Sequence, residues 1–217
     1  MSEFKITVDT HPFDDDLKLY QKKEFTLYPG INSLVGCNGS GKSTLIDCYL
    51  VEKLKKEHIG YYQHNDRHDG QQNYMSKLGF HEEYDELAQM FMASEGERIV
   101  RALAPVFSQL RQLFNEHKGN SVFIIFDAID SGMSVDEIIE IRELFLDLII
   151  PDAKSTFDVD AYMVIAANNY EWCNDSRIHN IDITTAKKIT FSSYEDYVKH
   201  IKNSRKKKDR MRGGTDE

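Results

Sequence analysis

Two patterns of apolar residues follow one another along the chain. Short apolar or alternating runs are typical of strands, and longer segments with apolar residues three and four apart are typical of helices. We expect strands within 4–8, 17–28, 31–35, 58–63, 121–126 and 161–167, and a hairpin formed by 181–183 and 189–191. We expect helices within 45–54, 82–92, 99–114, 134–150 and from 194 into the C-terminal tail. This alternation predicts an α/β domain with a mostly parallel sheet and antiparallel strands near the N-terminus.

Local signals predict where some of these helices begin and end. Ser134 and Glu137 have the spacing of a capping box, in which each side chain bonds the other residue's backbone N–H. Pro151 lacks a backbone N–H and is expected to stop the helix that Ser134 begins. Pro105 is expected to interrupt and kink the helix around 99–114.

One glycine-rich stretch stands between a predicted strand and a predicted helix. Its residues are Gly36, Cys37, Asn38, Gly39, Ser40, Gly41, Lys42, Ser43 and Thr44, which fit the phosphate-loop pattern G-x-x-x-x-G-K-[ST]. Glycines let successive backbone N–H groups face a phosphate, and the helix N-terminus adds its positive dipole end. Lys42 is therefore expected to reach the β- and γ-phosphates of a nucleotide, and the Ser43 hydroxyl to bind Mg²⁺.

An acidic residue follows the apolar strand 121–126. This places Asp127 at the carboxyl end of a buried strand, where ligands bind in open α/β sheets. A carboxylate at that position holds Mg²⁺ directly or through water in phosphate-loop proteins. A turn-forming role is the alternative for an aspartate at a strand end.

The four residues Ser94, Glu95, Gly96 and Glu97 open the long helix around 99–114. A capping box formed by Ser94 and Glu97 accounts for them without any further function. A serine and a glycine at a helix N-terminus also suit phosphate binding. Their position in the sequence, between Gln63 and Asp127, favours phosphate binding as an additional role.

Taken together, these motifs resemble the ATP-binding-cassette (ABC) ATPases, especially the branch of RecF and the structural-maintenance-of-chromosomes heads. The resemblance covers about residues 25–170. It implies a P-loop NTPase head in which two subunits enclose two ATP molecules with Mg²⁺. It further implies that Gln63 touches the metal and the attacking water, that Ser94, Glu95, Gly96 and Glu97 cap the partner's γ-phosphate, and that Asp127 is the second metal ligand.

Three positions depart from that family. A glutamate that acts as general base normally follows the aspartate, whereas this chain has Ala128, whose methyl group accepts no proton. Asp130 is the nearest carboxylate that could replace it, with a turn residue as the alternative. The D-loop aspartate falls at Ser134, and Asn169 with its neighbour stands in place of the switch histidine, where an amide still donates to a γ-phosphate.

Composition and charge narrow the class of protein. The chain has 217 residues and a net charge of −9, which argues against a surface that coats nucleic acid in general. A basic run from Arg205 to Arg212 is the exception, and we expect residues 1–204 to form one domain and 205–217 a flexible tail. No apolar run is long enough to span a membrane, and no signal peptide is recognised. With three cysteines, an odd number, a cytoplasmic protein with free thiols is expected.

Three functions remain open from the sequence. The first is an ABC-type ATPase head that dimerises with ATP and acts on a separate effector protein or on nucleic acid. The second is an ATP-dependent dimerisation switch with little hydrolysis, because of Ala128. The third is a small P-loop kinase, which would leave Gln63 and the Ser94–Glu97 motif unexplained.

Overall fold

The computed structural model describes residues 3–13, 18–65, 95–130, 133–166 and 168–211. Its centre is a six-stranded sheet with the strand order β4-β5-β6-β3-β7-β8. The strands are β3 (Gly30–Val35), β4 (Gly60–Asn65), β5 (Ser121–Asp127), β6 (Asp160–Ala166), β7 (His179–Asp182) and β8 (Lys188–Ile189). All neighbouring pairs are parallel except β7 with β8. The predicted α/β class with a mostly parallel sheet is confirmed.

A separate two-stranded sheet lies beside the central one. It consists of β1 (Phe4–Thr7) and β2 (Glu24–Leu27), which run antiparallel with Phe4 opposite Leu27. Both strands alternate between exposed or half-buried and buried positions, and their buried residues, such as Ile6 and Phe25, face the core. The predicted antiparallel strands near the N-terminus are therefore present.

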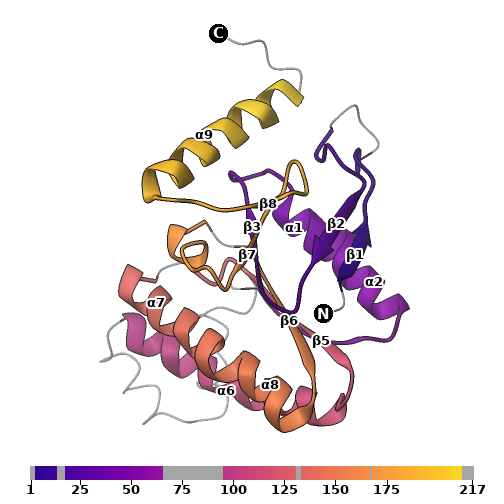
Figure 1. The fold of residues 1–217 in the computed structure, drawn as a ribbon, viewed down its shortest axis with the longest axis vertical. Coiled ribbons are helices and arrows are strands. Elements are labelled where there is room, and N and C mark those ends of the chain that lie inside the picture. The colour runs from indigo at the N-terminus through magenta and orange to yellow at the C-terminus, as the bar shows by residue number, and fades with distance from the viewer. Residues whose placement is uncertain (1–2, 14–17, 66–94, 131–132, 167, 212–217) are drawn as a thin grey trace, which may run out of the picture.

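Both faces of the central sheet are covered (Figure 1). One face packs against α6 (Glu95–Glu116) and the helical segment α7 (Val135–Leu144), η2 (Phe145–Ile149) and α8 (Ile150–Phe157). The other face packs against β1, β2 and the helical run α1 (Lys42–Thr44), η1 (Leu45–Leu50) and α2 (Val51–Lys56). Because strands in such a layer are buried on both sides, they read as continuous apolar runs, as Val122–Phe126 does.

The helix that begins after Ser134 starts as predicted but ends later. The N–H of Ser134 donates to Glu137 Oε2 at 2.7 Å, which completes the capping box. The expected stop at Pro151 is wrong, because the chain stays helical to Phe157. A wider π-type turn, η2, precedes the proline and accommodates its ring and its missing N–H. Pro105 likewise lies within an unbroken α6.

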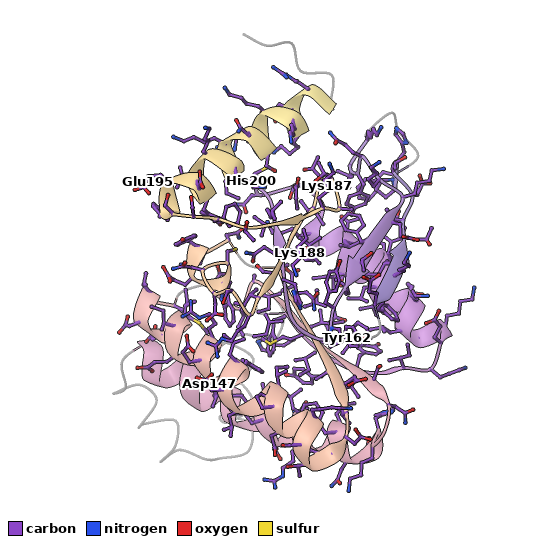
Figure 2. All side chains as sticks on the ribbon, viewed as in Figure 1. Asp147, Tyr162, Lys187, Lys188, Glu195 and His200 are labelled. Carbon is purple, nitrogen blue, oxygen red and sulfur yellow. The ribbon has the colours of Figure 1, made fainter. Side chains whose placement is uncertain are left out.

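The C-terminal part of the chain returns to the central strand β3. β7 pairs with β3, and the predicted hairpin is present as β7 and β8. Helix α9 (Tyr194–Met211) then packs through Tyr197 against Val35 and Cys173, and the 204/205 boundary falls inside it. Figure 2 shows α9, marked by Glu195 and His200, at the opposite end of the view from Asp147. None of the helices in the described ranges has both the length and the apolar composition needed to cross a membrane.

Candidate functional site

The glycine-rich loop lies at the carboxyl end of β3, between its neighbours β6 and β7. Two of its glycines have no substitute. A side chain on Gly36 would place its Cβ 2.4 Å from Ile183 Cγ2, and Gly41 has a φ of +100°, which disfavours any L side chain. The Tyr20 hydroxyl donates to the Gly41 carbonyl at 2.8 Å, so a buried tyrosine fixes the end of the loop.

Lys42 is the buried cation of the site. Its Nζ donates to the carbonyl oxygens of Gly36 at 2.8 Å and Cys37 at 3.5 Å, and to Asn168 Oδ1 at 3.0 Å. Only 8% of the residue is exposed, and no salt bridge joins it to a carboxylate among the described residues. Burial lowers the pKa of the Lys42 ammonium, and the charges of Asp127 and Asp130 are among those that partly offset this.

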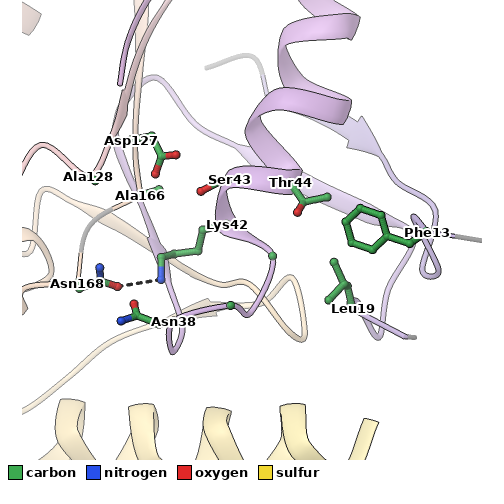
Figure 3. Close-up of a pocket in the computed structure, with 12 residues that line it drawn as sticks. Phe13, Leu19, Asn38, Lys42, Ser43, Thr44, Asp127, Ala128, Ala166 and Asn168 are labelled. Atoms are coloured by element: carbon green, nitrogen blue, oxygen red, sulfur yellow. Dashed lines mark hydrogen bonds between the residues drawn. The ribbon is translucent and has the colours of Figure 1, made fainter. Parts of the chain in front are cut away.

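A cavity of about 250 Å³ opens beside Lys42 (Figure 3). On one side the Asp127 carboxylate, 4% exposed at the end of β5, lies near the Ser43 hydroxyl. On the other side, beyond Thr44, the apolar side chains of Phe13 and Leu19 complete the lining. The cavity thus has a polar end with a cation, a carboxylate and a hydroxyl, and an apolar end.

The polar end of the cavity is lined by oxygen groups that suit a metal ion, the Ser43 hydroxyl and the Asp127 carboxylate. The Ser40 hydroxyl, in a loop residue that is 4% exposed, has no hydrogen-bond partner, but Ser40 does not line the cavity. Oxygen ligands suit Mg²⁺, which is usually held by one or two carboxylates together with substrate phosphates. Among the described residues no group of three or more His, Cys, Asp and Glu side chains is placed to hold a metal ion. Ser43 and Asp127 therefore fit a magnesium ion that a phosphate helps to bind.

Ala128 lines the same cavity in a strained conformation. Its φ is +61°, in the left-handed region, and its N–H donates to the Ala166 carbonyl at 3.0 Å. The hydrogen bond keeps β5 and β6 paired one residue past Asp127, so the backbone turns sharply right after the carboxylate. The methyl group at this position offers the cavity neither a proton acceptor nor a donor.

Replacing Ala128 by glycine should stabilise the protein. A left-handed residue with a Cβ costs about 1–2 kcal/mol, and the extra freedom of glycine in the unfolded chain returns about 0.4–1 kcal/mol of that. We expect Ala128→Gly to raise the free energy of unfolding by up to about 1 kcal/mol, measured by urea denaturation. Ala161→Gly, in the regular strand β6, is the control and should lower it. A loss of stability in Ala128→Gly would contradict the strain at this position.

Of the two asparagines after β6, the one that faces the loop is not the one that was predicted. Asn168, not Asn169, contacts the loop, through its bond to Lys42. The Asn169 side chain instead accepts from the Glu171 N–H and caps the short helix η3 (Tyr170–Trp172). Asp130 Oδ2 accepts from the backbone N–H of Asn168 at 2.8 Å, so this carboxylate positions Asn168.

Gln63 and the predicted signature motif Ser94–Glu97 are not among the described residues that line the cavity. Gln63 lies on β4, and its amide donates to Asp47 Oδ1 at 2.8 Å, one helical turn beyond Ser43. It does not line the cavity. Of the predicted signature, Ser94 lies outside the described residues, and Glu95, Gly96 and Glu97 form the first turn of α6.

Helix α9 makes contacts with the site that sequence reasoning missed. Ser204 Oγ accepts from the Cys37 N–H at 3.3 Å, and Lys208 Nζ donates to the Asn38 carbonyl at 3.2 Å. The Tyr197 hydroxyl donates to the Asn168 carbonyl at 2.8 Å. These contacts span at least 29 residues of sequence, and no local pattern could have indicated them.

Comparisons with known proteins add no relative. A scan against models of protein families matched none, and neither the curated proteins nor the solved structures contained a match.

Proposed function

We propose that this protein binds ATP with Mg²⁺ and works as an ABC-type ATPase that dimerises head to tail around two ATP molecules. The observation that carries the proposal is that the buried ammonium group of Lys42 has no anionic partner among the described residues. A buried charge in a protein is normally paired, yet the hydrogen bonds of this ammonium group go only to neutral oxygens. A phosphate in the adjoining cavity, which Lys42 lines, supplies the missing anion.

The residues around the cavity have separate roles in this proposal. Backbone N–H groups of the loop and the start of the helix at Lys42 hold the phosphates. Ser43 and Asp127 hold Mg²⁺, which neutralises charge that develops on the phosphates. Phe13 and Leu19 offer the base an apolar surface. Asn168 is released by Lys42 when the lysine turns to a phosphate, and its amide is then free to bond a phosphate oxygen.

Ala128 favours a second function, an ATP-dependent dimerisation switch with little turnover. Nothing at position 128 takes a proton from water, and Asp130 is already bonded to the Asn168 N–H. A missing general base typically slows a reaction by two to four orders of magnitude. In this case ATP persists and stabilises the dimer, because a ligand favours the state that binds it.

The partners follow from the same proposal. A second copy contributes Ser94, Glu95, Gly96 and Glu97 to the first copy's γ-phosphate, as in the family the sequence resembles. The dimer then acts on a separate effector protein or on nucleic acid, the latter through the basic run Arg205–Arg212, of which Arg205 to Met211 belong to helix α9.

One experiment separates these functions. Purified protein is mixed with ATP and Mg²⁺, and its mass by light scattering and the released phosphate are followed together. An ATPase gives an ATP-dependent dimer with phosphate release, and a switch gives a dimer without it. A monomer that transfers phosphate to an added acceptor would indicate a small P-loop kinase and contradict both.

A further inference from the structure

Helix α9 carries an excess of positive charge that the rest of the chain lacks. It contains seven lysine and arginine residues and three acidic ones, in a protein with a net charge of −9. Most of its cations are exposed to solvent: Lys199, Lys202, Arg205, Lys206, Lys207 and Arg210. Within the described part of the chain, Lys202, Arg205 and Lys206 form no salt bridge. These three cations are available to an anionic partner.

A groove of about 960 Å³ runs along the same helix. Its lining includes the three cations and Lys199, the two acidic residues Glu195 and Asp209, and the apolar Val198 and Ile201. The ring of Tyr194, which is 58% exposed, also lines it. The ring of Tyr194 lies edge-on against Tyr170, with ring centroids 5.5 Å apart, and nearly parallel to the ring of Tyr197 at 6.4 Å. A row of cations beside a positioned aromatic ring is the arrangement that binds single-stranded nucleic acid, with phosphates on the cations and bases on the ring.

Charge and shape favour this ligand over others. The acidic remainder of the chain repels a polyanion, which confines binding to α9. A duplex keeps its bases stacked inside, where Tyr194 cannot reach a base face. An acidic peptide would satisfy the cations but has no planar group for the ring.

The groove and the nucleotide cavity share one residue. Asn168 lines both of them. Its side chain bonds Lys42 on the cavity side, and its carbonyl accepts from the Tyr197 hydroxyl on the α9 side. Ser204 and Lys208 of α9 add two more bonds, to the N–H of Cys37 and the carbonyl of Asn38 in the loop. These hydrogen bonds connect Lys42 and the loop to α9.

We propose that α9 binds single-stranded nucleic acid along its groove, and that nucleotide in the loop changes the affinity of that binding through Asn168 and Tyr197. The second half rests on the proposed nucleotide binding, and the first does not. Coupling of this kind is reciprocal: if nucleotide changes the affinity for nucleic acid, nucleic acid changes the affinity for nucleotide by the same factor.

The binding half is tested without nucleotide. Fluorescence anisotropy of a labelled 16-nucleotide DNA or RNA strand is measured over a range of salt concentrations. Lys202→Glu/Arg205→Glu/Lys206→Glu should weaken binding at least about tenfold. Because this variant neutralises three phosphates fewer, the slope of log affinity against log salt concentration should become shallower by about 2. Lys22→Glu/Lys23→Glu/Lys56→Glu changes the net charge equally at exposed lysines away from α9 and should have little effect.

Two further measurements identify the ligand. Tyr194→Ala should lower the affinity for the single strand about fivefold or more, because stacking contributes at least about 1 kcal/mol per base. The affinity for a duplex of the same sequence should not change. Equal effects of the two triple variants would overturn the binding half. Equal affinity for polyglutamate of the same charge would overturn the choice of nucleic acid and indicate an acidic protein partner.

The coupling half is tested by adding ATP and Mg²⁺. The affinity for the strand should change about fivefold or more, the lower end of typical coupling. Tyr197→Phe removes the bond to Asn168 but keeps the ring, and should abolish the difference between the affinities measured with and without ATP. If calorimetry detects ATP binding while the affinity for the strand stays constant, the coupling is overturned. If calorimetry detects no ATP binding, the proposed function fails and the binding half stands.

Discussion

Lys42→Ala should lower the affinity for ATP about a hundredfold or more. A hydrogen bond to a charged group contributes up to about 3 kcal/mol, and each 1.4 kcal/mol corresponds to about tenfold in affinity. The lysine is the only described cation whose ammonium group lies at the polar end of the cavity. Isothermal titration calorimetry with ATP and Mg²⁺ measures the effect directly.

The fold should survive this substitution. The atoms that Lys42 contacts are two loop carbonyls and one amide, and its long side chain is not part of an apolar cluster. Lys56→Ala is the matched control, because this lysine is exposed at the end of the same helical run. Affinities that agree between Lys42→Ala and the parent protein would rule out the phosphate-loop assignment, provided that both variants melt cooperatively.

The parts of the fold that depend on local sequence could be predicted. The loop from Gly36 to Thr44 is specified by its own glycines, by the strand before it and by the helix after it, all within a short stretch. Asp127 was placed at a strand end because four apolar residues precede it, and the structure puts it beside Ser43. Such features need no knowledge of distant contacts.

The features that depend on tertiary contacts could not be predicted. Asn168 and Asn169 are adjacent and chemically identical, and only the hydrogen bonds of Asp130 and Glu171 decide which amide faces Lys42. The contact between α9 and the glycine-rich loop also depends on tertiary hydrogen bonds. The sequence predicted a flexible tail from residue 205, whereas helix α9 continues to Met211 and its Lys208 donates to the Asn38 carbonyl beside the site.

The helix after Ser134 illustrates a different limit. Pro151 is a strong local signal for a helix end, yet helical structure continues to Phe157. The residues on both sides of the proline, Phe145 and Phe157, are buried in the same cluster as α6 and the sheet. Their burial outweighs the lost backbone hydrogen bond, and the π-type turn η2 absorbs the mismatch.

Ala128→Glu should raise the rate of phosphate release by about two orders of magnitude or more, the usual contribution of a positioned general base. Position 128 lines the cavity directly after Asp127, so under the proposed function a carboxylate there would face water near the phosphates of ATP. ATP affinity should change little, because Lys42, Ser43 and the loop amides lie on another element of the site. The lifetime of an ATP-bound dimer should fall as turnover rises.

Ala128→Gln is the control for this prediction. Its side chain has the size of glutamate and the same strained backbone, with a φ of +61° at this position, but its amide accepts no proton at neutral pH. A steady-state phosphate assay should therefore show a gain for glutamate and none for glutamine. A parent protein that already hydrolyses ATP as fast as Ala128→Glu would assign the base to another group. Asp130 is then the first to test, since its carboxylate is held at the Asn168 N–H near the same cavity.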